Sequence, residues 1–379
     1  MKKLFISLVA VLFAATFSFA QSNSSTVTTS GTSNSATIGQ SGNSNLSTVD
    51  QIQSFGPGHT VNVDQSGTDN SSDILQTQTA ANANISQTGE SNTSGLKQSG
   101  YNDAYVTQNG NGNVLGKYSN FSGQAFQNNG SGYFTSDYNY LNLEQVGDNN
   151  KAGVWQEHHA TANIEVTGNM NNTKVYQEGP AFGDINTAAI SFKGDQNSAD
   201  IYQLGDGNSA SVNVGPYTDN LNTANISQTG NHNTASFGLQ MGNDNTTTIQ
   251  QSGGDNNYTE FFTNYGDNNT LSETVVGNSN RTRLHLSAAW GSKSSDNGVT
   301  INKSGNTNYV TGSIVGNDNT VDISQQGSNN RVGTSWYTMD GVNVNGNTNT
   351  IGINQTGSLN NSLNTITGNG NIVNVNQSN

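Results

Sequence analysis

The feature that most constrains this chain is a short unit that recurs from Ala36 to Gln377, in which a Gly is followed three residues later by an Asn. In many copies a Gln stands two residues before the Gly, as in Gln145-Val-Gly147-Asp-Asn-Asn150. Self-similarity of this kind is typical of repeat architectures, in which equivalent units stack on one another. We therefore expect a stack of similar layers rather than a globular domain built around one pocket.

The spacing of the unit favours strands over helices. Successive glycines often lie eleven residues apart, as Gly305, Gly316 and Gly327 do. Eleven residues also make three helical turns, but a Gly and several Asn per unit each disfavour a helix by roughly 0.5–1 kcal/mol. Apolar and polar residues instead alternate between Asn319 and Gln325, as they do along a strand. The residues between Gly and Asn are mostly Asn, Asp, Ser and Gly, which tolerate the positive φ of a tight corner.

One unit is thus predicted to form one strand and one corner, and two units to form a rung of about 22 residues in an all-β solenoid. With about fourteen rungs stacked roughly 4.8 Å apart, the rod has an expected length of about 65–70 Å.

In such a stack, equivalent Gln and Asn side chains lie above one another and form hydrogen-bonded ladders. Inward Ile and Val residues are expected to supply the apolar part of a thin core: Ile85, Ile164, Ile226, Val321 and Ile323. The predicted ladder residues and their corner glycines are Gln40, Gly42, Asn45, Gln51, Gln65, Gly67, Asn70, Gln76, Gln87, Gly89, Asn92, Gln98, Gln145, Gly147, Asn150, Gln156, Gln228, Gly230, Asn233, Gln240, Gly242, Asn245, Gln251, Gln325, Gly327, Asn330, Gln355, Gly357, Asn360 and Gln377.

Composition alone points to a different kind of chain. An apolar content of 30% and a mean hydropathy of −0.62 are typical of disordered or prion-like segments. The repeat period favours an ordered stack, because amide ladders can fill an interior that is too polar for an ordinary core. Acidic residues (26) outnumber basic ones (12), which disfavours nucleic acid and anionic membranes as partners.

The chain divides into three parts. Lys2 and Lys3 followed by the apolar stretch 4–19 predict a secretory signal peptide at 1–20, cut before Gln21. The stretch is short for a bilayer span, so we expect no membrane insertion. Residues 21–35 form a polar leader, and the repeat array is predicted to start with a strand at Ala36 and to continue to 379.

Insertions interrupt the repeats. Five of them are expected to replace corners, at 52–60, 156–161, 177–187, 216–222 and 288–297. The largest irregular stretch, 115–140, contains Tyr118, Phe121, Phe126, Tyr133, Phe134, Tyr138 and Tyr140. Two interpretations stay open: the rings pack inside or across the strands of degenerate rungs, or they form an exposed patch for adhesion or carbohydrate contact.

The repeats continue almost to Asn379. Repeat proteins generally have polar caps, and sheet edges are usually protected by charge, Pro or a covering element. Since neither end of the array shows such a device, we expect both ends to be open edges to which another copy can add.

The spacing Gln-x-Gly-x-x-Asn-x-Ala-x-x-x-Gln resembles the curlin repeat of bacterial curli, the extracellular amyloid fibres of biofilms. Gln145, Gly147, Asn150, Ala152 and Gln156 match it at every position, and several other units match all but the Ala. The resemblance implies a secreted fibre subunit of a Gram-negative bacterium that polymerises with itself. It also implies export through an outer-membrane pore addressed by residues 21–35, and growth from a nucleator subunit.

Some units depart from the pattern. Apolar residues replace the first Gln at Val166, Phe192, Ile314, Val344 and Ile366, while Lys303 takes that place in one unit and Asp103 replaces the Asn in another. These departures leave open whether the chain is a major fibre subunit, a minor nucleator or a related, non-polymerising surface adhesin or ligand-binding solenoid. Ice binding and carbohydrate-active enzymes are further alternatives, but regular Thr rows and clustered acids are missing.

No enzyme, metal or cofactor is expected. Glu157-His158-His159 is the one pattern-breaking cluster, and neighbouring residues of a strand point to opposite faces. Calcium at the corners is the stronger metal hypothesis, because calcium-binding β-roll repeats use Gly and Asp. The corner aspartates are Asp148, Asp206, Asp244, Asp267 and Asp318, but most copies carry Asn or Ser instead.

Overall fold

The computed structural model describes residues 22–128, 138–215, 219–286, 293–335 and 338–379. The predicted signal peptide, Tyr133 and Phe134 lie outside these residues. The described part of the chain consists of strands, corners and loops, and contains no helix. It accordingly has no helix long and apolar enough to cross a bilayer.

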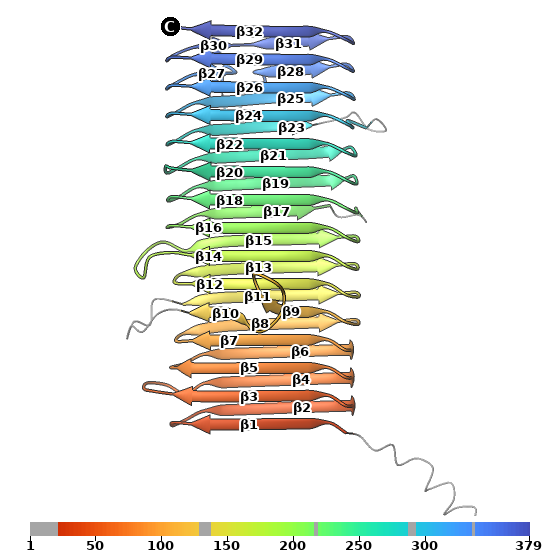
Figure 1. Ribbon diagram of the computed structural model, residues 1–379, viewed down its shortest axis with the longest axis vertical. Helices are drawn as coiled ribbons and strands as arrows, with labels where there is room; N and C mark the ends of the chain where they lie inside the picture. Colours follow the sequence, from red (N-terminus) through yellow and green to blue (C-terminus); the bar gives the residue numbers. More distant parts are fainter. Residues whose placement is uncertain (1–21, 129–137, 216–218, 287–292, 336–337) are drawn as a thin grey trace, which may run out of the picture.

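The strands form two facing parallel sheets that the chain visits in turn (Figure 1). Sheet A contains, in spatial order, β1 (Ser24–Ser30), β3 (Leu46–Gln53), β5 (Ser71–Gln78), β7 (Thr93–Ser99), β9 (Val114–Lys117) with β10 (Ala125–Asn128), β12 (Lys151–Glu157), β14 (Asn172–Glu178), β16 (Ser198–Leu204), β18 (Thr223–Thr229), β20 (Thr246–Ser252), β22 (Thr270–Val276), β24 (Gly298–Ser304), β26 (Thr320–Gln326), β29 (Thr350–Thr356) and β32 (Ile372–Ser378).

Sheet B contains β2 (Ser35–Asn43), β4 (Thr60–Thr68), β6 (Asn82–Glu90), β8 (Asn102–Asn109), β11 (Asn139–Val146), β13 (Ala160–Thr167), β15 (Asn186–Lys193), β17 (Ser209–Val214), β19 (Thr234–Met241), β21 (Tyr258–Tyr265), β23 (Arg281–Leu286), β25 (Tyr309–Val315), β27 (Arg331–Val332) with β28 (Val342–Asn345), and β30 (Asn361–Ser362) with β31 (Asn364–Thr367).

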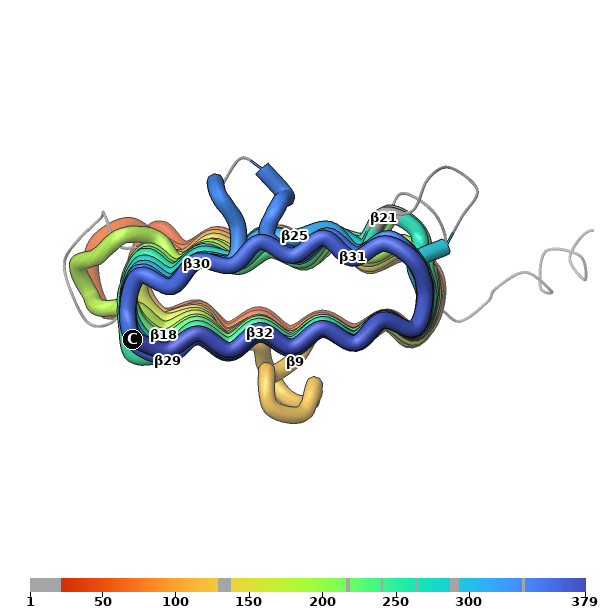
Figure 2. The backbone as a smooth tube through the Cα atoms, turned by 90° about the horizontal axis from the view of Figure 1, so that it is seen from above, coloured from red at the N-terminus to blue at the C-terminus, as the bar shows by residue number. Residues whose placement is uncertain are grey.

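Strands that share one height in a sheet, such as β9 and β10, form a single level. Counted this way over the described residues, sheet A has 15 levels and sheet B has 14. Seen along the rod, the backbone traces a flat oval with one sheet on each long side (Figure 2). The predicted β-solenoid of about fourteen two-strand rungs is therefore confirmed.

The first strand lies earlier than predicted. β1 pairs over its whole length with β3, although it precedes the first Gly-x-x-Asn unit, so the expectation of a first strand at Ala36 was wrong. The alternating, β-branched sequence of β1 suits an edge strand. Asn23 also supplies the corner amide that the other levels have, because its Oδ1 accepts the backbone N–H of Asn45 at 3.0 Å.

Most insertions lie at corners, as expected. Residues 54–59, 158–159 and 179–185 connect a strand of sheet A to the next strand of sheet B. Two insertions instead interrupt a strand: 118–124 separates β9 from β10, and 333–341 separates β27 from β28. The described residues of both, 118–124 and 333–335 with 338–341, protrude from the oval outline (Figure 2). The insertion at 333–341 was not predicted. It divides a single repeat unit, so that the part of the unit before it ends at Val332 and the part after it begins at Val342.

The corner glycines are required by the close stacking of the levels. Gly67 has a φ of +119°, and a Cβ built on it would lie 2.0 Å from the carbonyl oxygen of Gly89 on the next level. A Cβ built on Gly42 would likewise lie 2.0 Å from the carbonyl oxygen of Gly67. The backbone of one corner therefore leaves no room for a side chain at the equivalent position of the level below. Corner glycines thus allow the backbones of adjacent levels to approach at the strand spacing.

We expect Gly67→Ala to destabilise the solenoid by about 1–3 kcal/mol, because it combines a left-handed backbone with a backbone clash. The matched control is Gly298→Ala, since a Cβ there meets no atom within 4 Å. Chemical denaturation followed by circular dichroism measures both. Equal midpoints for the two variants would contradict this account of the corners.

Candidate functional site: the amide ladders and the outer edges

Each regular strand points three side chains into the thin interior. In β5 these are Ser72, Ile74 and Gln76, and in β6 they are Ala83, Ile85 and Gln87, all at most 1% exposed. Because the sheets are parallel and in register, each of the three positions forms a column along the rod. Two columns of each sheet are apolar or small, and the third carries the amides.

The glutamine column of sheet A forms a long ladder. Nε2 of each Gln donates to Oε1 of the Gln on the next level, at 2.7–3.1 Å, so that the donors point from β1 towards β32. Its members are Gln51, Gln76, Gln98, Gln127, Gln156, Gln177, Gln203, Gln228 and Gln251, then Gln325, Gln355 and Gln377. Sequence reasoning did not name Gln127, Gln177 and Gln203.

The glutamine column of sheet B is shorter. Gln40, Gln65, Gln87, Gln108 and Gln145 form hydrogen bonds of 2.8–3.0 Å, and Gln108 was not predicted. Above Gln145 the column continues with apolar residues on every level except that of Thr263, and these include Val166, Phe192, Ile314, Val344 and Ile366. The five apolar replacements noted in the sequence thus fall in one column of one sheet.

Gln240 does not occupy a ladder position. Leu239 pairs with Val214 and Thr263 in the column instead, because β19 has one more residue before Gly242 than regular strands have. The side chain of Gln240 lies outside the described part of the structure.

The asparagines at the corner that leads from sheet B to sheet A form a ladder with one member per level. Oδ1 of each Asn accepts the backbone N–H of the next Asn at 2.8–3.1 Å, and in most steps also its Nδ2–H. Its members are Asn23, Asn45, Asn70, Asn92, Asn113, Asn150, Asn171, Asn197, Asn222, Asn245, Asn269, Asn297, Asn319, Asn349 and Asn371.

Their donors point from β32 towards β1, opposite to those of the glutamines. The Nδ2 group also donates to the corner carbonyl of the next level, as Asn150 does to Gly168 at 2.7 Å. Sequence reasoning named five members of this ladder, and the Gly-x-x-Asn spacing marks several of the others.

The opposite corner has a shorter asparagine ladder. It contains Asn186, Asn208, Asn233, Asn257, Asn280, Asn308, Asn330 and Asn360. Nearer the N-terminus the insertions interrupt it, and His59 takes one place. Burial lowers the pKa of His59, which fits its use of Nδ1 as an acceptor for the N–H of Ala81 at 3.2 Å.

We expect Asn150→Ala to lower the unfolding free energy by about 3 kcal/mol, since it removes hydrogen bonds to both neighbouring levels and each contributes about 1 kcal/mol. Asn142→Ala, at an exposed position of β11, is the control and should have little effect. Guanidinium denaturation midpoints compare the two variants. A loss no larger at Asn150 than at Asn142 would show that the ladder contributes little to stability.

Two of the five predicted corner aspartates, Asp148 and Asp267, act as ladder members. Oδ1 of Asp148 accepts the backbone N–H of Asn111 at 2.8 Å, and Oδ1 of Asp267 accepts that of Asn243 at 2.9 Å. Asn169 makes the same contact with Asp148. Since Asn and Asp at this position both accept a backbone N–H of the neighbouring level, a corner Asp does not by itself indicate a calcium site. Asp244 and Asp318 lie at the left-handed corner position, with φ of 57° and 55°.

Asp206 is different, because its buried Oδ1 has no hydrogen-bond partner. The residue aligned with it one level below is Pro180, which has no N–H to donate. Asp206, Asp184 and His232 have potential ligand atoms within 4.8 Å of one another, and they are the one such group of three in the described residues that could hold a metal ion. A hydrogen bond of 2.9 Å from Nε2 of His232 to Oδ2 of Asp184 raises the pKa of His232.

Glu157, His158 and His159 form no group of this kind among the described residues. Both histidines have positive φ, and Nδ1 of His159 lies 2.6 Å from the carbonyl oxygen of Gly183. The insertion at 179–185 thus packs on this corner.

The aromatic residues of 115–140 that the structure describes lie on the outside of the rod. Leu115 and Ala125 are the buried apolar residues of this stretch, while Tyr118, Phe121 and Phe126 are half-buried. The interpretation that the rings pack inside is therefore wrong. They pack across strands: Phe126 stands next to Trp155 on the following level, with ring centroids 4.3 Å apart.

This outer column continues beyond the predicted stretch, from Phe126 and Trp155 to Tyr176 and Tyr202, whose rings stack at 4.8 Å. Tyr118, from the insertion at 118–124, packs on Tyr176 at 5.5 Å and donates its hydroxyl hydrogen to Asp200 at 2.8 Å. Each member stands directly before a ladder glutamine, as in Trp155-Gln156 and Tyr176-Gln177, so the sequence carries a signal for this column that sequence reasoning missed.

A buried ion pair interrupts the glutamine ladder of sheet A. Val275 and Lys303 replace Gln on two levels, and Lys303 Nζ lies 2.8 Å from Oε1 of Glu273, with both side chains fully buried. Glu273 stands in a column of Ile. Thr259 and Thr282 of sheet B donate hydrogen bonds to its carboxylate, and burial lowers the pKa of Lys303.

We expect Lys303→Ala to destabilise the rod by about 3–5 kcal/mol, because it leaves Glu273 buried without its partner. The double variant Glu273→Ile/Lys303→Gln restores the residue types of the two columns, and should be neutral or stabilising by about 1–4 kcal/mol. Thermal and chemical denaturation compare the two. A double variant as unstable as the single one would contradict this interpretation.

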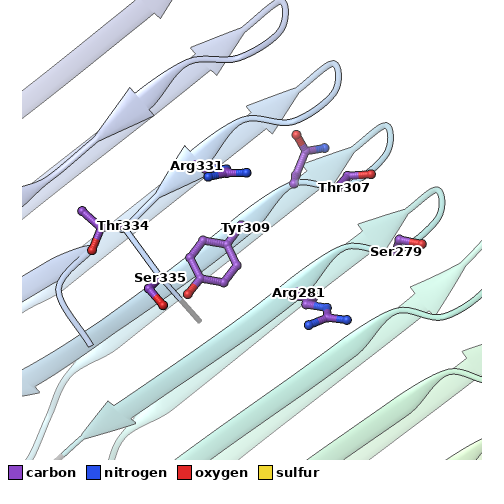
Figure 3. Close-up of a pocket in the computed structure, with 8 residues that line it drawn as sticks. Ser279, Arg281, Thr307, Tyr309, Arg331, Thr334 and Ser335 are labelled. Carbon is purple, nitrogen blue, oxygen red and sulfur yellow. The ribbon is translucent and has the colours of Figure 1, made fainter. Parts of the chain in front are cut away.

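A shallow hollow lies on the outer face of sheet B, with a volume of about 390 Å³. Arg281, Tyr309 and Arg331 line it from three successive levels, and Thr334 and Ser335 from the insertion border it (Figure 3). Two guanidinium groups beside hydroxyls can accept an anionic group. The lining contains no carboxylate pair for acid–base chemistry.

The rod ends in unpaired strand edges. Among the described residues, β1 and β2 have neighbours on one side, as do β32 and the level formed by β30 and β31. Oδ1 of Asn371 and Oε1 of Gln40, at opposite ends of their ladders, accept no hydrogen bond from the described part of the chain. Nε2 of Gln377 donates to Asn361 but has no Gln above it. The ladders therefore stop with unused hydrogen-bonding groups.

Comparison with protein families gives three matches to the curlin associated repeat, at residues 20–52, 31–67 and 220–253. The first two cover β1 to β3 and most of β4, and the third covers β18 to β20. Comparison with curated proteins gives no match.

Proposed function

Starting from a chain of curlin repeats, we propose that this is a secreted structural protein whose copies join end to end into curli-like fibres. The observation that carries the proposal is that one asparagine ladder follows the whole described rod, and that the ladders reaching the outer edges end there with unused groups. A second copy offers the same kinds of group at the same spacing. Its addition continues both sheets and the ladders without a new type of contact.

The outermost strands support this mode of assembly. β1, β2, β30, β31 and β32 contain no charged residue. Sheet edges that must stay unpaired usually carry charge or Pro. The chain as a whole has a formal net charge of −14, so contacts between the sides of two rods are repulsive while contacts between their ends are not. This distribution favours linear growth over lateral clumping.

The cellular setting is part of the same proposal, and rests on the curlin-repeat matches. We place the protein outside a Gram-negative cell, in a biofilm matrix or on the cell surface, where the fibres contribute to adhesion. Export uses a signal peptide at 1–20 and an outer-membrane pore, and a nucleator subunit starts growth. The role is structural rather than enzymatic, with no cofactor.

A second function is favoured by the aromatic column. Phe126, Trp155, Tyr176 and Tyr202 form a partly exposed strip on the outer face of sheet A, bordered by Lys97 and Lys117. Aromatic strips beside polar groups suit contact with surfaces or ligands. The protein would then serve as a solenoid adhesin, with or without polymerisation.

The test uses residues 21–379 released from denaturant and followed by thioflavin-T fluorescence and electron microscopy. We expect a lag, then unbranched fibres, and no lag after seeding. A charged helical cap fused directly after Asn379 should slow elongation at least tenfold, because it covers the edge of β32.

The control carries the same helix on a long Gly/Ser linker, which leaves the edge accessible, and should elongate normally. A persistent β-rich monomer would contradict self-assembly and leave the adhesin function as the better explanation. Undiminished growth of the directly capped variant would contradict growth through the β32 edge.

A further inference from the structure

The two sheets have unequal numbers of levels, and this affects how copies can join. The described chain starts with β1 in sheet A, alternates between the sheets, and ends with β32, again in sheet A. Sheet A has 15 levels and sheet B has 14. The rod therefore consists of an odd number of half-turns of the solenoid. We consider copies of residues 21–379, and rest the inference on the proposed end-to-end assembly.

Simple translation of a second copy along the rod does not close both sheets. If β1 of the added copy pairs with β32, sheet A continues at the normal spacing. On sheet B, β2 of the added copy then lies two strand spacings from β30 and β31, about 9.6 Å instead of 4.8 Å. One strand position stays vacant, and the facing edges of sheet B lose their backbone hydrogen bonds.

We propose that consecutive copies are instead related by a half-turn about the long axis of the rod. The added copy then places β2 on β32 and β1 on β30 and β31, and both sheets continue without a vacancy. Strands of the two sheets run in opposite directions (Figure 1). A half-turn exchanges the sheets and also reverses the strand direction, so the pairing across the junction stays parallel.

The inward side chains at the junction favour the half-turn. In register, Gln377 meets Gln40 of the added copy, while Val373 meets Ala36 and Val375 meets Ile38. Nε2 of Gln377 then donates to Oε1 of Gln40, so that the glutamine ladder of sheet A continues into that of sheet B. Under translation, Gln377 would meet Thr29, which holds the Gln position of β1.

The other side of the junction is compatible but less specific. Ser362 meets Ser25 of the added copy, Asn364 meets Val27 and Ile366 meets Thr29. The corner asparagines match in either arrangement, because Asn23 and Asn34 both stand at corner positions. Two observations thus select the half-turn: the unequal numbers of levels in the two sheets, and the continuation of the glutamine ladder across the junction.

The half-turn determines where the surface features lie on a fibre. Each copy advances the fibre by about 14.5 strand spacings, or about 70 Å. The insertion at 118–124 and the aromatic column beside it then appear on opposite sides of the fibre in successive copies. The same side recurs about every 140 Å.

The experiment places a gold label on this insertion. Ser122 is exposed and the chain has no cysteine, so Ser122→Cys in residues 21–379 gives a single attachment site. Electron microscopy of the fibres should show labels alternating between the two sides, about 70 Å apart along the axis. Helical reconstruction of unlabelled fibres should give a rotation per subunit that differs by about 180° from the accumulated twist of the rod.

A matched variant lacks β1 and consists of residues 34–379 with the same label. It has 14 levels in each sheet, so its copies should stack by translation, with labels on one side and Gln377 meeting Gln51. The expected result is a half-turn difference between the two fibres. Labels on one side in fibres of residues 21–379 would overturn this inference alone. A failure of that chain to form fibres would overturn the proposed function and this inference with it.

Discussion

The interaction on which the structure depends is the hydrogen bond between a buried amide and an equivalent amide one level away. In a parallel, in-register stack each side chain has its counterpart as a neighbour at the strand spacing. A carboxamide carries both a donor and an acceptor, so it can bond to a copy of itself indefinitely. Gln and Asn therefore occupy positions where most buried polar groups would lack a partner, and a chain with 30% apolar residues builds a buried interior.

The same constraint governs the charged residues. Two copies of a carboxylate or an ammonium group repel each other, so neither can form a column. Glu273 and Lys303 accordingly occur in the interior as one pair, held by threonines of the facing sheet. Aspartates recur at corners, where a backbone N–H of the neighbouring level is the donor. Oδ1 of Asp206 has no such donor, because Pro180 has no backbone N–H.

The spacing of Gln, Gly and Asn was sufficient to predict the solenoid, its two-strand rungs and most corner insertions, because each follows from local sequence. The register of strands across an insertion does not follow from local sequence. Gln127 belongs to the ladder although the insertion at 118–124 separates it from its unit, whereas Gln240 has the right spacing from Gly242 but one residue too many before it. β1 was missed because it pairs through backbone groups rather than through the repeat. The aromatic column was missed because sequence reasoning followed the inward positions, although each of its rings directly precedes a ladder glutamine.

The opposed donor directions of the two kinds of ladder affect the electrostatics of a long rod. The amide oxygens of the glutamines point towards β1, and those of the corner asparagines point towards β32. The dipole moments of aligned amides add, and a rod with one kind of ladder would accumulate partial charge at its ends as helices do. Because the two kinds oppose each other, their moments partly cancel in the rungs that contain both. A rung added to a long rod then meets a smaller accumulated field than it would in a rod with one kind of ladder.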